Sequence, residues 1–340
     1  MTGEIAELQE SARRVLDGAG LAADEAKTWP QIVELGWLLV AVPEELGGLG
    51  LGLTAASALY TEIGRGLAAI PYLPAMLSID AVCHSGLADR EIWVERLAGG
   101  ENYVATPLAA ALLSAEKGGV TGTLSAVPSA DKASHVLLMA ADQVALLPLA
   151  QSGVKVTARQ TWDKTRRLFD IRLEAVAIDE ELVLARGEAA AALVRRLSTH
   201  RDFALAADAV GGASALLERT VEYLQTRRQF ARPLALFQAI KHRCADLKTI
   251  IAAAEALLVD SLGRIEDPGD EAAALMAKQA KSLACSTYFH VTEEGIQLHG
   301  GIGVTAEHPC HLFLKRAMLD AQLGAPGDSY ARDIAAAILG

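Results

Sequence analysis

The chain has 340 residues, 51% hydrophobic and 21% charged, which is an ordinary globular composition and long enough for two or three domains. Its 42 acidic residues outnumber 31 Lys and Arg, giving a formal net charge of −11. Such an acidic chain is a poor candidate for binding nucleic acid or an anionic membrane surface, so we expect neither partner.

Targeting and compartment are predicted from what the chain contains. The opening MTGEIAELQE is acidic and lacks an apolar run, so we expect no signal peptide. No stretch of about 18 apolar residues stands out, so we expect no membrane span. Four scattered cysteines show neither metal-ligand nor disulfide spacing: Cys83, Cys244, Cys285 and Cys310. They are predicted to be buried thiols in a reducing cytoplasm.

Residues 1–100 are predicted to be helical. The first helix is marked by apolar residues three and four apart, namely Ile5, Leu8, Ala12 and Leu16. The segment AVPEELGGLGLG (41–52) combines a proline with four glycines and is predicted to be a loop. Another helix is expected over 53–65.

The composition changes over residues 101–185. Short runs rich in apolar and β-branched residues, among them HVLLMA, QVALLPL and GVKVTA, alternate with Gly, Asp and Ser. This pattern is typical of antiparallel strands, so we predict a small β-domain. Trp162, near its end, is interpreted as a core or interface residue.

Residues 186–340 are predicted to be helical again. Apolar residues at alternating steps of three and four predict a long packing seam: Phe237, Ile240, Cys244, Leu247, Ile251, Ala254 and Leu258. The sequence DPGD (267–270) is a turn between helices, and 271–299 is the last long helix. Four helices with short connections predict a bundle.

Two stretches of this helical region carry chemistry as well as pattern: YLQTRRQFARPLALFQ (223–238) and QLHGGIGVT (297–305). Pro233 prevents the first from continuing as a helix, so Arg227, Arg228 and Gln229 lie at a helix end and turn. The glycines of the second let a ligand approach closely and leave N–H donors free. An arginine, an amide and a glycine turn are together suited to hold a diphosphate.

The order R-x-Q-F-x-x-P, F-Q and Q-x-x-G-G-x-G-x-T resembles the C-terminal half of the acyl-CoA dehydrogenases, flavoenzymes that oxidise an acyl-CoA thioester to its 2,3-enoyl form. The stretches ELGWLLVAVPEELGGLGLG and TEIGRGLAAIPY are similar to their N-terminal domain. The resemblance implies a mostly α fold with an N-terminal helical domain (1–100), a short central antiparallel β-domain (101–185) and a C-terminal four-helix bundle (186–340). Members usually assemble as tetramers.

The resemblance implies FAD as cofactor, and it assigns residues to it. Arg227 falls where the family's arginine contacts the flavin diphosphate, and the residues that follow in register are Gln229, Phe230 and Gln238. The family's Q-x-x-G-G segment, which receives the adenine end of the flavin from a neighbouring subunit, is matched by Gln297, Gly300 and Gly301. Taken singly, Arg227 could pair with an acid and Gln297 could be a capping amide. Ala231 stands where the family usually has glycine.

Acyl-CoA oxidation needs a carboxylate to remove the proton alpha to the thioester while the flavin takes a hydride. The family places this Glu at one of two sites. At the first, this chain has Leu323-Gly324-Ala325 and no acid. At the second, placed at the start of the helix that ends in Arg227, it has Arg201, which cannot act as a base, beside Asp202. We interpret Asp202 as pairing with Arg201 or capping the helix, and we assign no catalytic residue.

The flavin-ring loop departs from the family as well. Where members carry Thr-Glu-Pro and Gly-Ser-Asp, this chain has ATPLAAALLSAEKGG (105–119). We therefore predict one subunit of a hetero-oligomeric dehydrogenase that completes the FAD site of a homologous partner. The resemblance to paired members associated with steroid side-chain breakdown implies a steroid-derived acyl-CoA substrate, and electron-transfer flavoprotein is the family's usual acceptor. The alternatives are a self-sufficient homo-oligomer that uses Asp202 as base, and a structural relative without flavin.

Three histidines surround the glycine turn: His299, His308 and His311. The sequence HPCH looks like a metal site, but zinc needs a defined fourth ligand, which is not evident. The stretch GVTAEHPCHLFLKRA instead resembles a pattern, W-E-H-x-x-H-L-Y-L, of one branch of the family. We interpret the histidines as structural or interface groups and predict no metal site.

Overall fold

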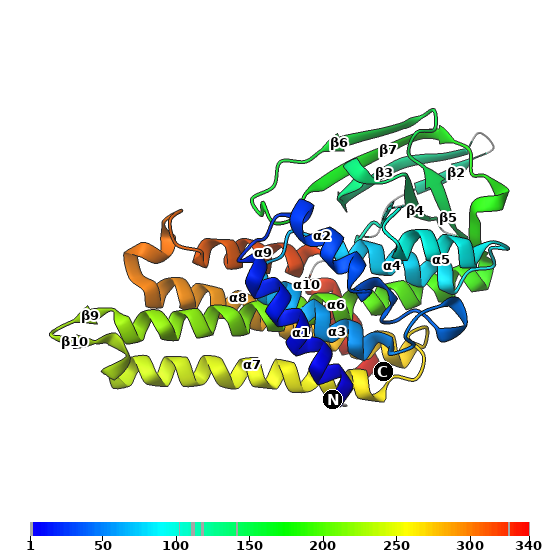
Figure 1. Cartoon of the computed structure of the whole chain (residues 1–340). Helices are drawn as coiled ribbons and strands as arrows, with labels where there is room; N and C mark the ends of the chain where they lie inside the picture. Colours follow the sequence, from blue (N-terminus) through cyan, green and yellow to red (C-terminus); the bar gives the residue numbers. More distant parts are fainter. Residues whose placement is uncertain are drawn as a thin grey trace.

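The computed structural model describes residues 3–101, 103–109, 113–116, 119–140, 142–325 and 327–339. N-terminal helices, a β-domain and a C-terminal helical bundle follow one another along the chain, as predicted (Figure 1). The β-domain lies on one side of the helical layer, and the long helices extend to one side beyond it. Part of the predicted ring-loop segment, residues 110–112 and 117–118, lies outside the described residues.

The N-terminal helices are α1 (Gly3–Ala19), α2 (Glu25–Glu34), α3 (Gly52–Gly66), α4 (Tyr72–Cys83) and α5 (Arg90–Ala98). The predicted stripe of α1 is confirmed, because Ile5, Ala12 and Leu16 are buried. Helix α2 begins at Glu25 because the Asp24 carboxylate accepts a hydrogen bond from the Ala26 N–H, which satisfies a free donor of the first turn.

The β-domain contains two four-stranded sheets. One has the order β1 (Val104–Ala105), β4 (His135–Met139), β5 (Gln143–Pro148), β8 (Val183–Arg186). The other has the order β2 (Leu113–Glu116), β3 (Gly119–Pro128), β7 (Leu168–Val176), β6 (Val154–Ala158). The described pairings are antiparallel except that of β1 with β4, which is parallel and departs from the prediction.

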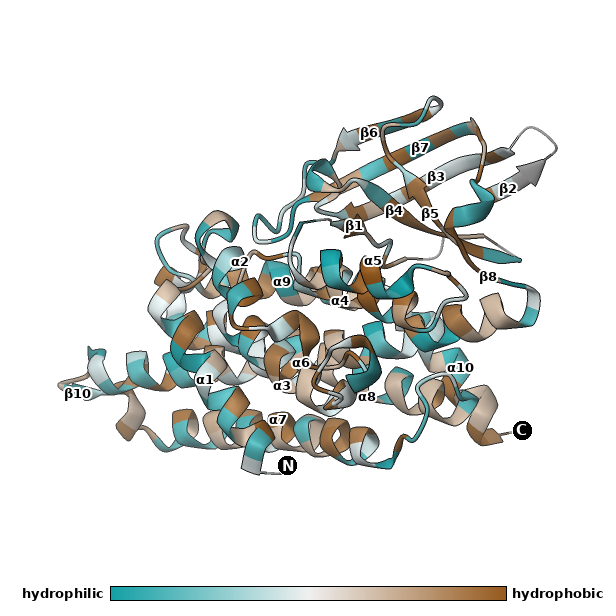
Figure 2. Ribbon diagram, turned by 45° about the vertical axis from the view of Figure 1, so that its right-hand side comes forward, coloured by the Kyte–Doolittle hydropathy of each residue, from teal (hydrophilic) through white to brown (hydrophobic). Residues whose placement is uncertain are grey.

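The first sheet lies between the helices and the second sheet. Successive side chains of a strand point to opposite faces. Leu137 of β4 therefore joins the core shared with the helices, whereas Val136 and Leu138 join the core between the sheets. Apolar segments of β5 and β8 lie beside the helical layer in Figure 2. Trp162, after β6, is 86% exposed, so its interpretation as a core residue is wrong and only the interface interpretation remains.

The C-terminal helices are α6 (Gly187–Thr226), α7 (Gln238–Arg264), α8 (Glu271–His299), α9 (Cys310–Gln322) and α10 (Gly327–Leu339). Helix α6 has 40 residues, and its centre is buried. It meets α3 with backbone against backbone: a Cβ on Gly211 would lie 1.9 Å from the Thr61 carbonyl oxygen, and one on Gly64 would lie 2.1 Å from that of Asp208. Glycine at these two positions permits the close packing.

The predicted seam of α7 is only partly formed. Leu247, Ile251, Ala254 and Leu258 are buried, whereas Phe237, Ile240 and Cys244 are half-buried. The first half of α7 runs beyond the N-terminal helices, so fewer elements cover it (Figure 1). It runs at the end of the bundle where residues 226–238 connect α6 to α7, which is called the free end below. None of the described helices has the length and apolar character needed to cross a bilayer.

Candidate flavin-binding end and base position

The R-x-Q-F stretch forms a hairpin at the free end of the bundle. Helix α6 ends at Thr226, and β9 (Arg228–Gln229) pairs antiparallel with β10 (Arg232–Pro233). The two turn residues, Phe230 and Ala231, have φ of 51° and 63°, as a two-residue type I′ turn requires. Ala231 therefore adopts a conformation that glycine takes without steric cost, which explains the expected glycine at this position.

Arg227 lies at this end, and its guanidinium is unpaired within the described chain. Its neighbours are engaged: the Arg228 guanidinium donates to the Ala231 carbonyl oxygen at 3.1 Å, and that of Arg232 lies 3.9 Å from the Phe237 ring centroid. Arg227 is exposed, and its guanidinium has no ion pair or hydrogen bond with any described residue. The alternative in which Arg227 pairs with an acid is therefore not met within the described chain.

The glycine turn follows α8. Gly300 has φ of 64°, and a Cβ on Gly303 would lie 2.7 Å from the Ile296 carbonyl oxygen, so the fold itself requires glycine at both. Gly301 is different, because its φ is not positive and a Cβ there would meet nothing within 4 Å. Because glycine has no side chain, the surface beside Gly301 is open to a group from outside the chain. Gln297 is exposed, and its side-chain amide caps nothing among the described residues, because the Gly300 N–H bonds to its backbone carbonyl.

The two segments lie at the same end of the bundle. The Tyr223 hydroxyl, one turn before Arg227, donates to the carbonyl oxygen of His299 at 3.2 Å. Gln238 is the first residue of α7, so it also belongs to this end. All the residues predicted to bind the cofactor are exposed: Arg227, Gln229, Phe230, Gln238, Gln297, Gly300 and Gly301. The free end thus offers a cation, amides and an open glycine to a group outside the chain.

Beneath the glycine turn lies a cluster of His299, His308 and Cys310, whose ligand-type atoms are within 4.8 Å of one another. The prediction had grouped His311 with the histidines, but His311 Nε2 lies 3.3 Å from the Ala306 carbonyl oxygen. Burial lowers the pKa of His299 and His308 and raises that of Cys310 to about 12, so all three are neutral near pH 7. Their packing supports a structural role, and the absence of a metal stays a prediction.

The two expected base positions converge elsewhere, at the middle of α6. Arg201 donates to Asp202 at 2.8 Å, to the Leu108 carbonyl oxygen at 3.3 Å and to the Tyr330 hydroxyl at 3.3 Å. A Cβ on Gly324, at the first expected position, would lie 2.5 Å from that hydroxyl and 2.9 Å from Arg201 Nε, so both expected positions face the same point. A guanidinium therefore stands where a base is expected.

Asp202 is committed to this network. Tyr330 donates to the Asp202 carboxylate at 2.8 Å, and the Asp202 side chain is 3% exposed. Pairing with Arg201 is confirmed. Capping is wrong, because Asp202 lies in the interior of α6 rather than at its start. Buried between an arginine and a tyrosine, this carboxylate is poorly placed to remove a substrate proton.

The chain was compared with known proteins. Residues 4–101 match the model of the acyl-CoA dehydrogenase N-terminal domain, and residues 190–339 match that of the C-terminal domain. It is 34% identical over 311 residues to the acyl-CoA dehydrogenase IpdE2 of Mycobacterium tuberculosis (strain ATCC 25618 / H37Rv), covering 90% of this chain and 85% of the relative. The chain belongs to the acyl-CoA dehydrogenase family.

Solved structures share the whole fold of this acyl-CoA dehydrogenase. The Tcur3481-Tcur3483 steroid ACAD (G363A variant) is 27% identical with a TM-score of 0.87, covering 99% of this chain and 98% of that one. The ChsE4-ChsE5 complex from Mycobacterium tuberculosis is 24% identical with a TM-score of 0.88, covering 100% of this chain and 98% of that one. The latter likeness concerns the fold alone.

Acyl-CoA dehydrogenases are FAD-dependent oxidoreductases that act on CH–CH groups, and the free end of the bundle fits the ADP part of FAD. An uncommitted guanidinium matches a diphosphate, and the space at Gly301 admits a bulky group. The base position does not fit the acyl-CoA end of a complete site, because Arg201 and Gly324 occupy it.

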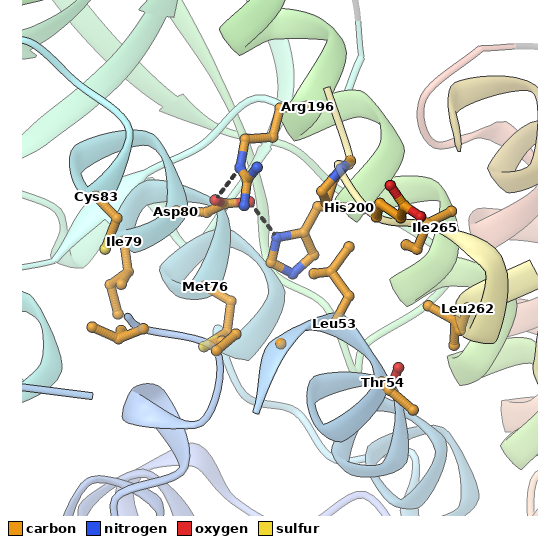
Figure 3. Close-up of a pocket in the computed structure, with 15 residues that line it drawn as sticks. Leu53, Thr54, Met76, Ile79, Asp80, Cys83, Arg196, His200, Leu262 and Ile265 are labelled. Atoms are coloured by element: carbon orange, nitrogen blue, oxygen red, sulfur yellow. Dashed lines mark hydrogen bonds and ion pairs between the residues drawn. The ribbon is translucent and has the colours of Figure 1, made fainter. Parts of the chain in front are cut away.

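A separate cavity of about 250 Å³ is lined by α3, α4, α6 and the end of α7. Figure 3 shows Asp80 there between Arg196 and His200, which donate to its two oxygens at 2.7 and 2.8 Å. Burial alone would raise the pKa of Asp80, but hydrogen bonds from His200 and His84 hold it well below its usual value. These side chains engage one another, so they link α4 to α6 rather than offering free groups to a ligand.

A second buried network joins the β-domain to the bundle. Arg316 of α9 is fully buried and donates to Asp163, Thr165 and Asp208 at 3.2, 2.6 and 3.0 Å. Burial and the nearby charge of Asp208 raise the pKa of Asp320 well above its usual value, which favours the neutral form of this carboxyl. This network was not predicted from the sequence, because its members are scattered over more than 150 residues.

Proposed function

We propose that this acyl-CoA dehydrogenase chain is one subunit of a hetero-oligomer and completes the FAD site of a homologous partner subunit. One contrast carries the proposal. At the free end of the bundle, Arg227 has no partner among the described residues and Gly301 is open, whereas the base position is filled by Arg201 and its partners. A chain whose described residues leave the cofactor-binding end open and provide no base at the expected positions fits a shared site.

In this proposal the residues of the free end bind and orient the cofactor. Arg227 binds the diphosphate, for which a guanidinium has matching planar geometry. Gln297 and the glycine turn receive the adenine end, and Gln229, Phe230 and Gln238 complete the surface. When bound, FAD supplies the hydride acceptor for 2,3-desaturation of an acyl-CoA thioester. The partner supplies the carboxylate that removes the alpha proton, because no described residue at either expected position of this chain can do so.

The comparisons support the pairing and suggest a substrate. The name of the Tcur3481-Tcur3483 steroid ACAD joins two components, and this chain is 27% identical to the matched one. We therefore propose a steroid-derived acyl-CoA as the substrate of the assembled enzyme. We further propose a heterotetramer in the cytoplasm that passes electrons to an electron-transfer flavoprotein.

Flavin stoichiometry tests the shared site. This chain would be purified alone and with the dehydrogenase-like product of its neighbouring gene, and visible flavin absorbance measured per mole of chain. We expect little flavin alone and about one FAD per pair of chains in the complex. One FAD per chain in the isolated protein would support a self-sufficient homo-oligomer, and no flavin in either preparation would support a structural relative without flavin.

Asp202→Asn separates a shared site from a self-sufficient one. Removal of a catalytic base lowers kcat by about 10²–10⁴-fold. If the base belongs to the partner, the variant complex should retain kcat within about threefold of wild type. Dehydrogenation of a steroid-derived acyl-CoA would be followed with an artificial electron acceptor, with Asp328→Asn in the exposed α10 as a matched control. A fall of orders of magnitude for Asp202→Asn alone would make Asp202 the base.

A further inference from the structure

The flavin-binding end is built from two segments far apart in the sequence. Arg227 follows α6, and the turn of Gly300 and Gly301 follows α8. Both must keep a fixed spacing if they are to bind one dinucleotide, because misplacement of a positioning group weakens its contribution. Neither segment is buried, so core packing does not hold them in place.

Tyr223 contacts both segments. Its own carbonyl oxygen accepts a hydrogen bond from the Arg227 N–H at 2.8 Å. Its hydroxyl donates to the carbonyl oxygen of His299, the residue before Gly300, at 3.2 Å. The rings of Tyr223 and His299 are stacked, with centroids 4.5 Å apart and planes at 27°. One tyrosine thus links the residue that bears the cation to His299, the residue that directly precedes the glycine turn.

His299 is itself held firmly. Its Nδ1 lies 2.7 Å from the Gly295 carbonyl oxygen and 3.4 Å from Cys310 Sγ, and the His308 ring centroid is 4.3 Å away. Burial lowers the pKa of His299, so a neutral ring stacks on Tyr223 near pH 7. The tyrosine therefore bonds to a point fixed by both α8 and α9.

We propose that Tyr223 and His299 are positioning residues that hold Arg227 and the glycine turn at the spacing that FAD requires. The inference rests on the proposed function. It adds that the affinity for FAD depends on two side chains that act through the segments they join. It also gives the His299–His308–Cys310 cluster a role, as the support on which this link is built.

Tyr223→Phe tests the link, because it removes the hydroxyl and keeps the ring. We expect the complex of both subunits, stripped of FAD, to rebind it about 3- to 10-fold more weakly, which is the effect of losing one neutral hydrogen bond. FAD affinity would be measured by quenching of flavin fluorescence, and the thermal midpoint of the stripped complex should not change. The matched control is Tyr103→Phe, whose hydroxyl donates to the Pro128 carbonyl oxygen in the β-domain, away from this end.

A double variant distinguishes positioning from general destabilisation. Gln297→Ala removes part of the FAD contact on the glycine-turn side. Adding Tyr223→Phe to Gln297→Ala should then weaken FAD binding by less than about twofold, because coupled residues are not additive. Wild-type affinity for Tyr223→Phe, with weakened binding by Arg227→Ala, would overturn this inference and leave the proposed function standing. Unchanged affinity for both Arg227→Ala and Gln297→Ala would overturn the proposed function, and the inference with it.

Discussion

Arg227→Ala is expected to weaken FAD binding by the assembled enzyme about 10- to 100-fold. Hydrogen bonds to a charged group contribute about 1.5–3 kcal/mol, and each 1.4 kcal/mol is a factor of ten in affinity. Arg227 has no competing ion pair among the described residues, so its full donor capacity is available to the diphosphate. The dissociation constant of FAD from the co-purified complex is the quantity to measure.

The neighbouring arginine provides the control for this prediction. Arg228 is equally exposed but already donates to the Ala231 carbonyl oxygen, so Arg228→Ala should change FAD affinity by less than about threefold. Arg227→Lys should fall between the wild type and Arg227→Ala, because lysine keeps the charge and loses the planar fork. Equal losses for Arg227→Ala and Arg228→Ala would indicate a general electrostatic effect and would remove the specific assignment of Arg227.

Arg316→Met is expected to lower the free energy of unfolding by about 3–5 kcal/mol, the cost of removing one member of a buried ion-pair network. The change removes the cation that pairs with Asp163 and leaves Asp208 with Arg166 alone. Because Arg316 joins α9, α6 and the loop before β7, the loss should affect the attachment of the β-domain to the bundle. Urea unfolding of the purified complex, followed by circular dichroism, measures it.

Asp320→Asn is the matched control within the same network. Since burial and Asp208 raise the pKa of Asp320 and so favour its neutral form, an amide of the same shape alters the local charge less than the loss of Arg316 does. Its urea midpoint at pH 7 should therefore lie near that of the wild type. Wild-type stability for Arg316→Met, or a loss for Asp320→Asn as large as that for Arg316→Met, would contradict this account of the network.

Local rules predicted the helices of the bundle well. The helix expected over 271–299 has those bounds in the structure, because Asp270 precedes its first turn and Gly300 ends it in a conformation that other residues avoid. Strand β3 was not among the predicted runs, because Gly119, Gly122 and Ser125 interrupt its apolar pattern. It forms because β2 and β7 supply hydrogen-bond partners on either side, which a single segment does not reveal.

The cofactor-binding end and the base position differ in how far they could be predicted from the sequence. The residues proposed to bind the cofactor belong to two short motifs, so resemblance to the family was enough to propose them, and their role stays a prediction. The closure of the base position was not predictable, because Tyr330 lies 128 residues after Asp202 and approaches it only when α10 packs against α8 and α6. The sequence grouped His311 with His299 and His308, whereas in the structure Cys310, the first residue of α9, lies beside His299.

Helix α6 fixes the distance between these two ends. Arg201 and Arg227 are 26 residues apart on one continuous helix and its C-cap, which at about 1.5 Å per residue places their backbones about 39 Å apart. That span exceeds the length of a single dinucleotide. In the proposed assembly, a flavin held by Arg227 therefore cannot have its ring beside Arg201 of the same chain, so the length of α6 assigns its two ends to two different cofactor positions.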